Sequence, residues 1–188
     1  MSKLRADIER YYELAGIEGP VSRSRRFAAY LNPRLIPNIF LRLSEYFFNR
    51  HLKFVSKFFS MLNVVLFGIE ISGRVEIEGG LFLPHTVGTV IGAERIGFNT
   101  TIMQGVTLGA REPDIRCKVS MQPIVGNHVL IGAGAKIIGR VTIGDHAKIG
   151  ANAVVLHDVP PHAVVAGIEA RIVQLPQPET KNESLPSG

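Results

Sequence analysis

The chain has 188 residues, a net charge of +5 and hydrophobic side chains at 46% of its positions. This length allows one or two domains with a sizeable core, and the single cysteine, Cys117, excludes a disulfide framework and favours a reducing compartment. The charge is uneven, because residues 1–67 carry a net charge of +6 and residues 68–188 a net charge of −1. Since the positive charge is confined to an apolar N-terminal stretch, we expect no nucleic-acid binding. The basic stretch suggests an acidic partner, such as anionic lipid or an acidic glycan, or equally a solvated helix face with no partner.

The N-terminal region, residues 1–67, is predicted to be α-helical, because apolar residues recur there at helical spacing. The last helical stretch, residues 35–66, is very apolar, but charges interrupt it before it reaches the ~18 residues that a spanning helix needs. We expect this stretch to pack on the protein or a neighbouring subunit, or to contact a membrane surface through Lys53 and Lys57. The first residues lack the apolar core of a signal peptide, so we expect a cytoplasmic protein, with the inner membrane face as an alternative site.

Residues 68–175 contain a six-residue repeat, which is clearest between residues 125 and 155. Every sixth side chain there is aliphatic and β-branched, and before five of these six the residue two places earlier is small or branched. A period of six fits neither a helix nor a strand, and it is typical of a β-helix in which each repeat supplies one short strand and one corner. The predicted inward residues are Val125, Ile131, Ile137, Ile143, Ile149 and Val155. Residues 176–188 have the composition of a flexible tail.

The repeat fails in two places. Upstream it runs from Ile71 to Leu83, slips by one residue around His85, and is predicted to resume with Val90 as an inward residue. The second break, residues 109–123, contains no hexad and is crowded with charges, which predicts a loop that leaves the coil. A break in a regular scaffold is where a functional site is expected.

With both breaks in place, the sequence resembles the hexapeptide-repeat acyltransferases, and among them the serine O-acetyltransferase branch. The resemblance covers about residues 68–175 and implies a left-handed parallel β-helix, usually assembled as a homotrimer. It also implies transfer of an acetyl group from acetyl-CoA to a hydroxyl, in clefts between subunits. The motifs that carry it are Gly80-Leu-Phe-Leu-Pro-His85-Thr-Val-Gly88, Gln104-Gly-Val-Thr-Leu-Gly109, Ile131-Gly-Ala-Gly-Ala-Lys136, Ala147-Lys-Ile-Gly-Ala151, Val159-Pro-Pro-His162 and Ala170-Arg171-Ile172-Val173.

The resemblance places the catalytic histidine at His85. A base must take the proton of the acceptor hydroxyl as its oxygen attacks the thioester, and a histidine titrates near neutral pH. The family has an aspartate fifteen residues before this histidine, and here that position is Glu70, a carboxylate one methylene longer. Such a carboxylate fixes the tautomer and orientation of the imidazole. The other histidines show no metal-ligand spacing, so we expect no metal.

Two departures from the serine enzymes bear on the acceptor. Those enzymes carry an aspartate directly before the catalytic histidine, where this chain has Pro84, and an Arg-His pair where this chain has Met121-Gln122. An ammonium and a carboxylate left unpaired in a cleft would bind poorly. Pro84 and Gln122 therefore favour a neutral acceptor, such as a sugar hydroxyl in surface polysaccharide or lipid-linked glycan synthesis. Two alternatives stay open: a serine O-acetyltransferase of cysteine biosynthesis, and a non-catalytic β-helix assembly module.

The resemblance also places contacts to acetyl-CoA. Small residues let a backbone N–H or C=O approach the amides of the pantetheine, and cations are needed for the phosphates. The small residues at the matching positions are Gly109, Ala110, Ala133, Gly134 and Ala151. The candidate cations are Lys136, Lys148 and Arg171.

Overall fold

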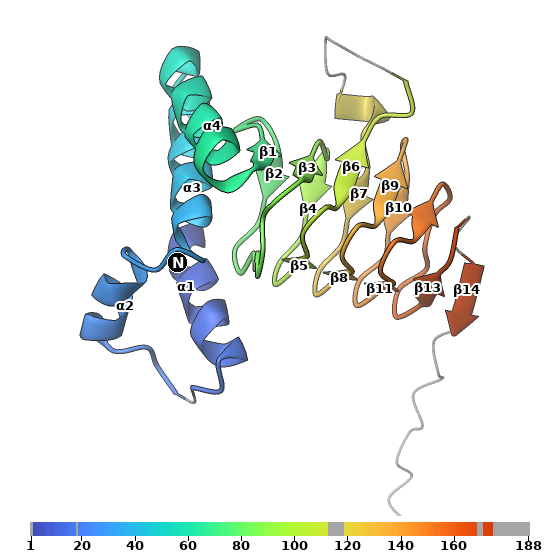
Figure 1. The fold of residues 1–188 in the computed structure, drawn as a ribbon, viewed down its shortest axis with the longest axis horizontal. Helices are drawn as coiled ribbons and strands as arrows, with labels where there is room; N and C mark the ends of the chain where they lie inside the picture. Colours follow the sequence, from blue (N-terminus) through green and yellow to red (C-terminus); the bar gives the residue numbers. More distant parts are fainter. Residues whose placement is uncertain (1, 18, 113–118, 169–170, 175–188) are drawn as a thin grey trace, which may run out of the picture.

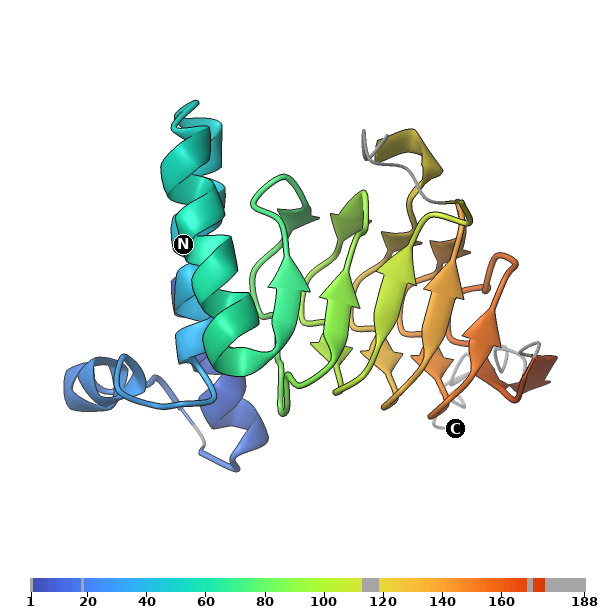
Figure 2. The same ribbon diagram turned by 45° about the horizontal axis from the view of Figure 1, so that its top comes forward.

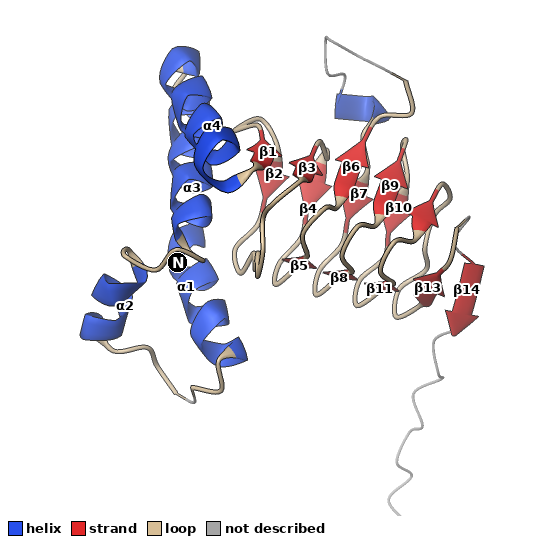
Figure 3. Ribbon diagram, viewed as in Figure 1, coloured by secondary structure: helices blue, strands red, loops and turns tan. Residues whose placement is uncertain are grey.

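The computed structural model describes residues 2–17, 19–112, 119–168 and 171–174, and shows helices at the N-terminal end of a β-helix (Figures 1 and 3). No helix in this part of the chain is long and apolar enough to cross a membrane. The helices are α1 (Lys3–Leu14), α2 (Arg23–Ala29), α3 (Ile36–Asn49) and α4 (Lys53–Phe67), with a 3-10 turn at Val119–Met121. The strands are β1 (Ile69–Ile71), β2 (Glu76–Ile77), β3 (Thr89–Ile91), β4 (Arg95–Ile96), β5 (Thr101–Ile102), β6 (Thr107–Gly109), β7 (Ile124–Val125), β8 (Leu130–Ile131), β9 (Lys136–Ile138), β10 (Thr142–Ile143), β11 (Lys148–Ile149), β12 (Val154–Val155), β13 (Val164–Ala166) and β14 (Arg171–Gln174).

Three parallel sheets form the faces of the prism (Figure 2). Sheet A has the order β1-β3-β6-β9-β12, sheet B has β2-β4-β7-β10, and sheet C has β5-β8-β11-β13, with β14 added antiparallel to β13. All six predicted inward residues between Val125 and Val155 are buried, so the hexad prediction is confirmed. The pairing of Val125 with Ile143 shows that these coils repeat every three hexads. The core is therefore a stack of aliphatic layers.

The upstream break differs from the predicted single slip. Ile91, not Val90, lies beside Ile71 in the core, and Val90 points outward, so the prediction for Val90 was wrong. The corner after Leu83 is therefore two residues longer than a hexad allows, and the step from Ile91 to the buried Ile96 is one residue shorter. From the sequence, only the net change of one residue between Leu83 and Ile96 was visible. Val90 and Ile91 are both β-branched, so either of them fits the inward position of the hexad.

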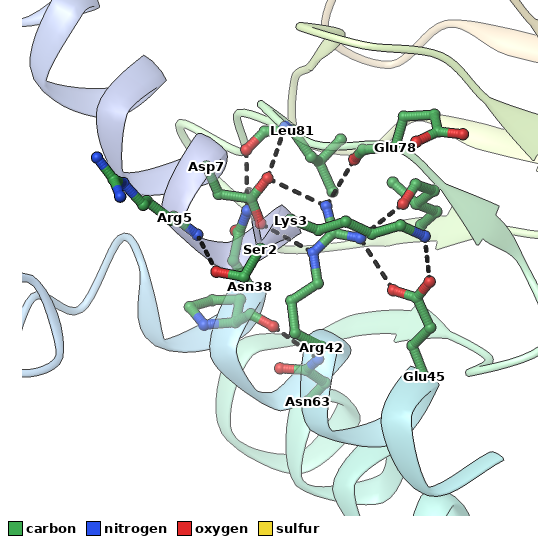
Figure 4. A network of polar contacts seen from close by, with 12 residues as sticks. Ser2, Lys3, Arg5, Asp7, Asn38, Arg42, Glu45, Asn63, Glu78 and Leu81 are labelled. Atoms are coloured by element: carbon green, nitrogen blue, oxygen red, sulfur yellow. Dashed lines mark hydrogen bonds and ion pairs between the residues drawn. The ribbon is translucent and has the colours of Figure 1, made fainter. Parts of the chain in front are cut away.

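The first coil has no coil beneath it, and α1 and α3 close its open end (Figure 4). Arg42 donates to both carboxylate oxygens of Asp7, at 2.9 and 3.0 Å, and to the carbonyl oxygens of Ile77 and Glu78, at 2.7 and 2.6 Å. Asp7 also accepts the backbone N–H of Leu81 at 2.9 Å. Backbone groups that a further coil would have paired are thus paired by buried side chains.

Candidate active site

His85 lies on the edge of the prism between sheets C and A. We call this the His85 edge, and its residues are Pro84–Gly88, Met103–Gly105, Gly132–Gly134 and Gly150–Asn152. Its corners stack directly, since the N–H of Gly134 donates to Gln104 and the N–H of Asn152 donates to Ala133, both at 2.8 Å. The structure thus brings His85, Pro84, Ala133, Gly134 and Ala151 onto one edge, on the first, third and fourth of its stacked corners.

The two additional residues of the first corner hold His85 away from the core. The Thr86 hydroxyl donates to the carbonyl of Phe67 at 2.7 Å, and the N–H of Gly88 donates to Gly68 at 2.9 Å. These bonds fasten the widened corner to the end of α4, and the His85 side chain stays exposed. A reacting hydroxyl can therefore reach the imidazole. Thr86 was not predicted as a site residue, and the length of the corner is the signal that could have found it.

Glu70 occupies the outward position of β1, exposed and paired in register with Val90. Among the residues described, no hydrogen bond joins Glu70 to His85. Instead Glu70 lines a cavity between α4 and the first coil, together with Lys53 and Lys57. The pairing of Glu70 with His85 stays a prediction. For the two side chains to form a hydrogen bond, at least one of them would have to rotate when substrate binds.

A second group of predicted residues lies on the other edge of sheet A. Gly109 ends β6 and Ala110 follows it, and the N–H of Gly139 donates to the carbonyl of Gly109 at 2.8 Å. Gln122 is half-buried, and its Nε2 lies 3.7 Å from the point that a Cβ on Gly92 would occupy. Within a single chain, the width of sheet A therefore separates His85 from Gly109, Ala110 and Gln122. Residues 113–118 of the predicted loop lie outside the described part of the chain.

The three predicted cations fall in different places. Lys136 lies on sheet A, and its ammonium donates to the carbonyl of Gly105 and to the hydroxyl of Thr107, which places it against the His85 edge. Lys148 is exposed on sheet C. Arg171 begins β14, and its side chain lies outside what the structure describes. Lys136 is thus the described cation whose side chain contacts the His85 edge, which carries Ala133, Gly134 and Ala151.

The edge between sheets B and C carries His128, His146 and His162, whose φ values are 56°, 59° and 61°. Their rings are stacked at 4.7 Å between neighbouring centroids and are nearly parallel. Because the lone pair of an imidazole lies in the ring plane, stacked rings do not converge on one metal ion. Within the described ranges, no group of three or more His, Cys, Asp or Glu could hold a metal.

Comparison with known proteins gives a consistent answer. A family described as "Bacterial transferase hexapeptide (six repeats)" matches residues 122–157. The chain is 37% identical to a serine acetyltransferase of Helicobacter pylori strain J99 over 157 residues, which is 83% of this chain and 90% of the relative. It is 40% identical to the serine acetyltransferase of Staphylococcus xylosus over 141 residues, 74% of this chain and 61% of the relative. The chain belongs to the serine acetyltransferase family. It is an acyltransferase.

Solved structures of this family have the same fold. A serine acetyltransferase of Neisseria gonorrhoeae superimposes with a TM-score of 0.79 at 29% identity, over 99% of this chain and 71% of that one. A serine acetyltransferase in complex with CoA superimposes with a TM-score of 0.76 at 31% identity, over 91% of this chain and 68% of that one. The left-handed parallel β-helix with an N-terminal helical region, expected from the resemblance, is thereby confirmed.

Proposed function

We propose that this protein transfers the acetyl group of acetyl-CoA to the hydroxyl of L-serine. The observation that carries the proposal is the similarity to serine acetyltransferases over most of both chains. A solved relative is described in complex with serine and another with CoA, which supports the same pair of substrates here. The neutral sugar acceptor expected from the sequence has no support among these relatives.

The reaction needs one base and a surface that holds the thioester. His85 would take the proton of the serine hydroxyl while that oxygen attacks the thioester carbonyl. The tetrahedral intermediate would collapse with loss of the CoA thiolate, which takes the proton back from the imidazole. Glu70 would orient the imidazole, while Ala133, Gly134 and Ala151 would face the pantetheine arm along the His85 edge. Lys136 would lie near a CoA phosphate.

One observation keeps a neutral hydroxylated acceptor as a second candidate. None of the residues of the His85 edge is acidic, and Pro84 stands directly before His85. An amino acid bound there would need a partner for its ammonium, and Glu70 on β1 is the carboxylate that could supply it. A sugar hydroxyl has no such requirement, and the amide of Gln122 could hydrogen-bond to it.

A thiol-release assay separates the two candidates. The purified full chain would be offered acetyl-CoA with L-serine or with a panel of neutral sugars, in parallel reactions. Saturable turnover with L-serine supports the proposal, and turnover with a sugar alone would replace it with the second candidate. His85→Asn should lower kcat/KM by about 10²–10⁴-fold with the productive acceptor, with KM for acetyl-CoA nearly unchanged. Wild-type turnover in this variant would remove His85 from the mechanism.

The assembly and location belong to the proposal as well. His85 and Gln122 lie on opposite edges of sheet A, so a homotrimer, the usual assembly of the family, would let the loop of one subunit approach the His85 edge of another. Light scattering on the purified chain measures this directly. A cytoplasmic location would supply acetyl-CoA. Contact of residues 35–66 with a membrane surface is also a proposal, and the exposed face of α4 is the part of this stretch that would make the contact.

A further inference from the structure

Helix α4 exposes an apolar outer face, with Phe54 87% and Val65 72% exposed. Its inner face holds the polar side chains of Ser56 and Asn63, which are 3% and 1% exposed, together with Phe59, whose ring packs against α3. Exposed apolar residues follow the helix at positions 54, 58, 61 and 65, which form one stripe about 16 Å long. Contiguous apolar surface of this kind marks an interaction site rather than a solvated helix.

The inner face of α4 cannot exchange places with the outer face. The Ser44 hydroxyl lies 3.0 Å from the Ser56 hydroxyl and 2.9 Å from that of Ser60, which joins α3 to α4. The side-chain amide of Asn63 donates to the carbonyl of Pro37 at 3.1 Å. Rotating α4 would break these buried hydrogen bonds, each of which would leave an unpaired polar group. The apolar stripe is therefore a built feature of the folded chain.

Cations and a cavity border this stripe. The cavity has a volume of about 420 Å³, lies between α4 and the first coil, and is lined among others by Lys53, Lys57, Met61, Val64, Glu70 and Arg74. Lys53 and Lys57 are exposed, and α4 contains no acidic residue. Glu70 is the carboxylate that lines this cavity, beside the two lysines of α4. Basic residues beside exposed phenylalanines are the pattern that lies at the boundary between headgroups and acyl chains of anionic membranes.

We propose that the outer face of α4 docks the protein on a bilayer surface that contains anionic phospholipid, with headgroup phosphates received by Lys53 and Lys57. The charge pattern favours this partner over a second copy of the chain. Two copies meeting through α4 would bring Lys53 and Lys57 of each together, with no carboxylate on either helix to offset them. Docking there would also hold the first coil, with Glu70 and the His85 corner, close to the membrane.

Vesicle co-sedimentation of the full chain tests the proposal. We expect binding to vesicles of phosphatidylcholine mixed with phosphatidylglycerol, weaker binding in high salt, and none to phosphatidylcholine alone. Lys53→Gln and Lys57→Gln should each weaken binding about fivefold. The double variant Phe54→Ser with Val65→Ser should weaken it at least about tenfold. Phe98→Ser is the matched control, because Phe98 is a half-exposed aromatic on the second coil, at the edge between sheets B and C and not on α4, and it should bind like the wild type.

Three results would overturn the proposal. These are equal binding to both kinds of vesicle, equal losses in the Phe98 control and the α4 variant, and a fall in the light-scattering mass of the α4 variant with vesicle binding unchanged. The last result would show that the outer face of α4 binds a second copy of this chain. Thermal melting and thiol release without vesicles should be unchanged in the α4 variant. His85→Asn should still bind vesicles, so failure of the docking and failure of the proposed catalysis are separately visible.

Discussion

Asp7 supports a sharp prediction, because its carboxylate is the centre of the cap on the first coil. The side chain of Asp7 is 0% exposed and that of Arg42 8%. Burial lowers the pKa of the Arg42 guanidinium, but the carboxylates of Asp7 and Glu45 outweigh it and raise that pKa, so Arg42 stays charged. Asp7→Ala would leave this cation buried with Glu45 as its remaining carboxylate partner, and the N–H of Leu81 without an acceptor. Removing one partner of a buried ion pair costs about 3–5 kcal/mol, and because Glu45 stays we expect the lower end of this range, still a large share of the stability of a typical domain.

Urea unfolding followed by circular dichroism measures this change. Glu9→Ala is the control, because it removes the exposed pair between Arg5 and Glu9, which should cost less than about 1 kcal/mol. Asp7→Leu combined with Arg42→Met should recover only part of the loss, since the carbonyls that Arg42 serves remain unpaired. If Asp7→Ala cost no more than Glu9→Ala, the reasoning from burial and bidentate pairing would be refuted.

Two other predictions concern the edges of the prism. Gly134 has φ +72°, and a Cβ there would lie 2.1 Å from Oδ1 of Asn152, so Gly134→Ala should lower the unfolding free energy by about 1–2 kcal/mol in urea. Gly109→Ala, with nothing within 4 Å of its Cβ, should not, and an equal loss would contradict the argument. Hydrogen bonds from the backbone and side chain of Asn127, and then the charges of His146 and His128, lower the pKa of Asp145. That carboxylate therefore contributes stability above its unfolded pKa of about 4, which is lost as pH falls through the lower folded value. Asp145→Asn should be less stable than wild type at pH 7, and the difference should shrink below pH of about 4. A difference that persists undiminished in strong acid would exclude this cause.

The hexads were predictable because the constraint on them is local. An inward residue such as Ile131 or Ile149 fills one layer, and its neighbours in sequence provide the strand and corner, so the period is visible in the chain itself. The helical stretches were predictable for the same reason. Val90 was misplaced because two length changes nearly cancel between Leu83 and Ile96, and only pairing with another coil distinguishes the inward residue. That pairing is a property of the stack.

The site shows the same division. The sequence by itself determined the family pattern, the position of His85 at a break, and the small residues Ala133 and Ala151 that share its edge, because corners recur at fixed spacing along the chain. Only the tertiary structure decided that Gln122 lies across sheet A from His85 and that Glu70 opens into a cavity. It also decided that α4 turns Ser56 and Ser60 inward, because that choice depends on the hydroxyl of Ser44 on another helix. Such contacts join residues far apart in the chain, and no local period encodes them.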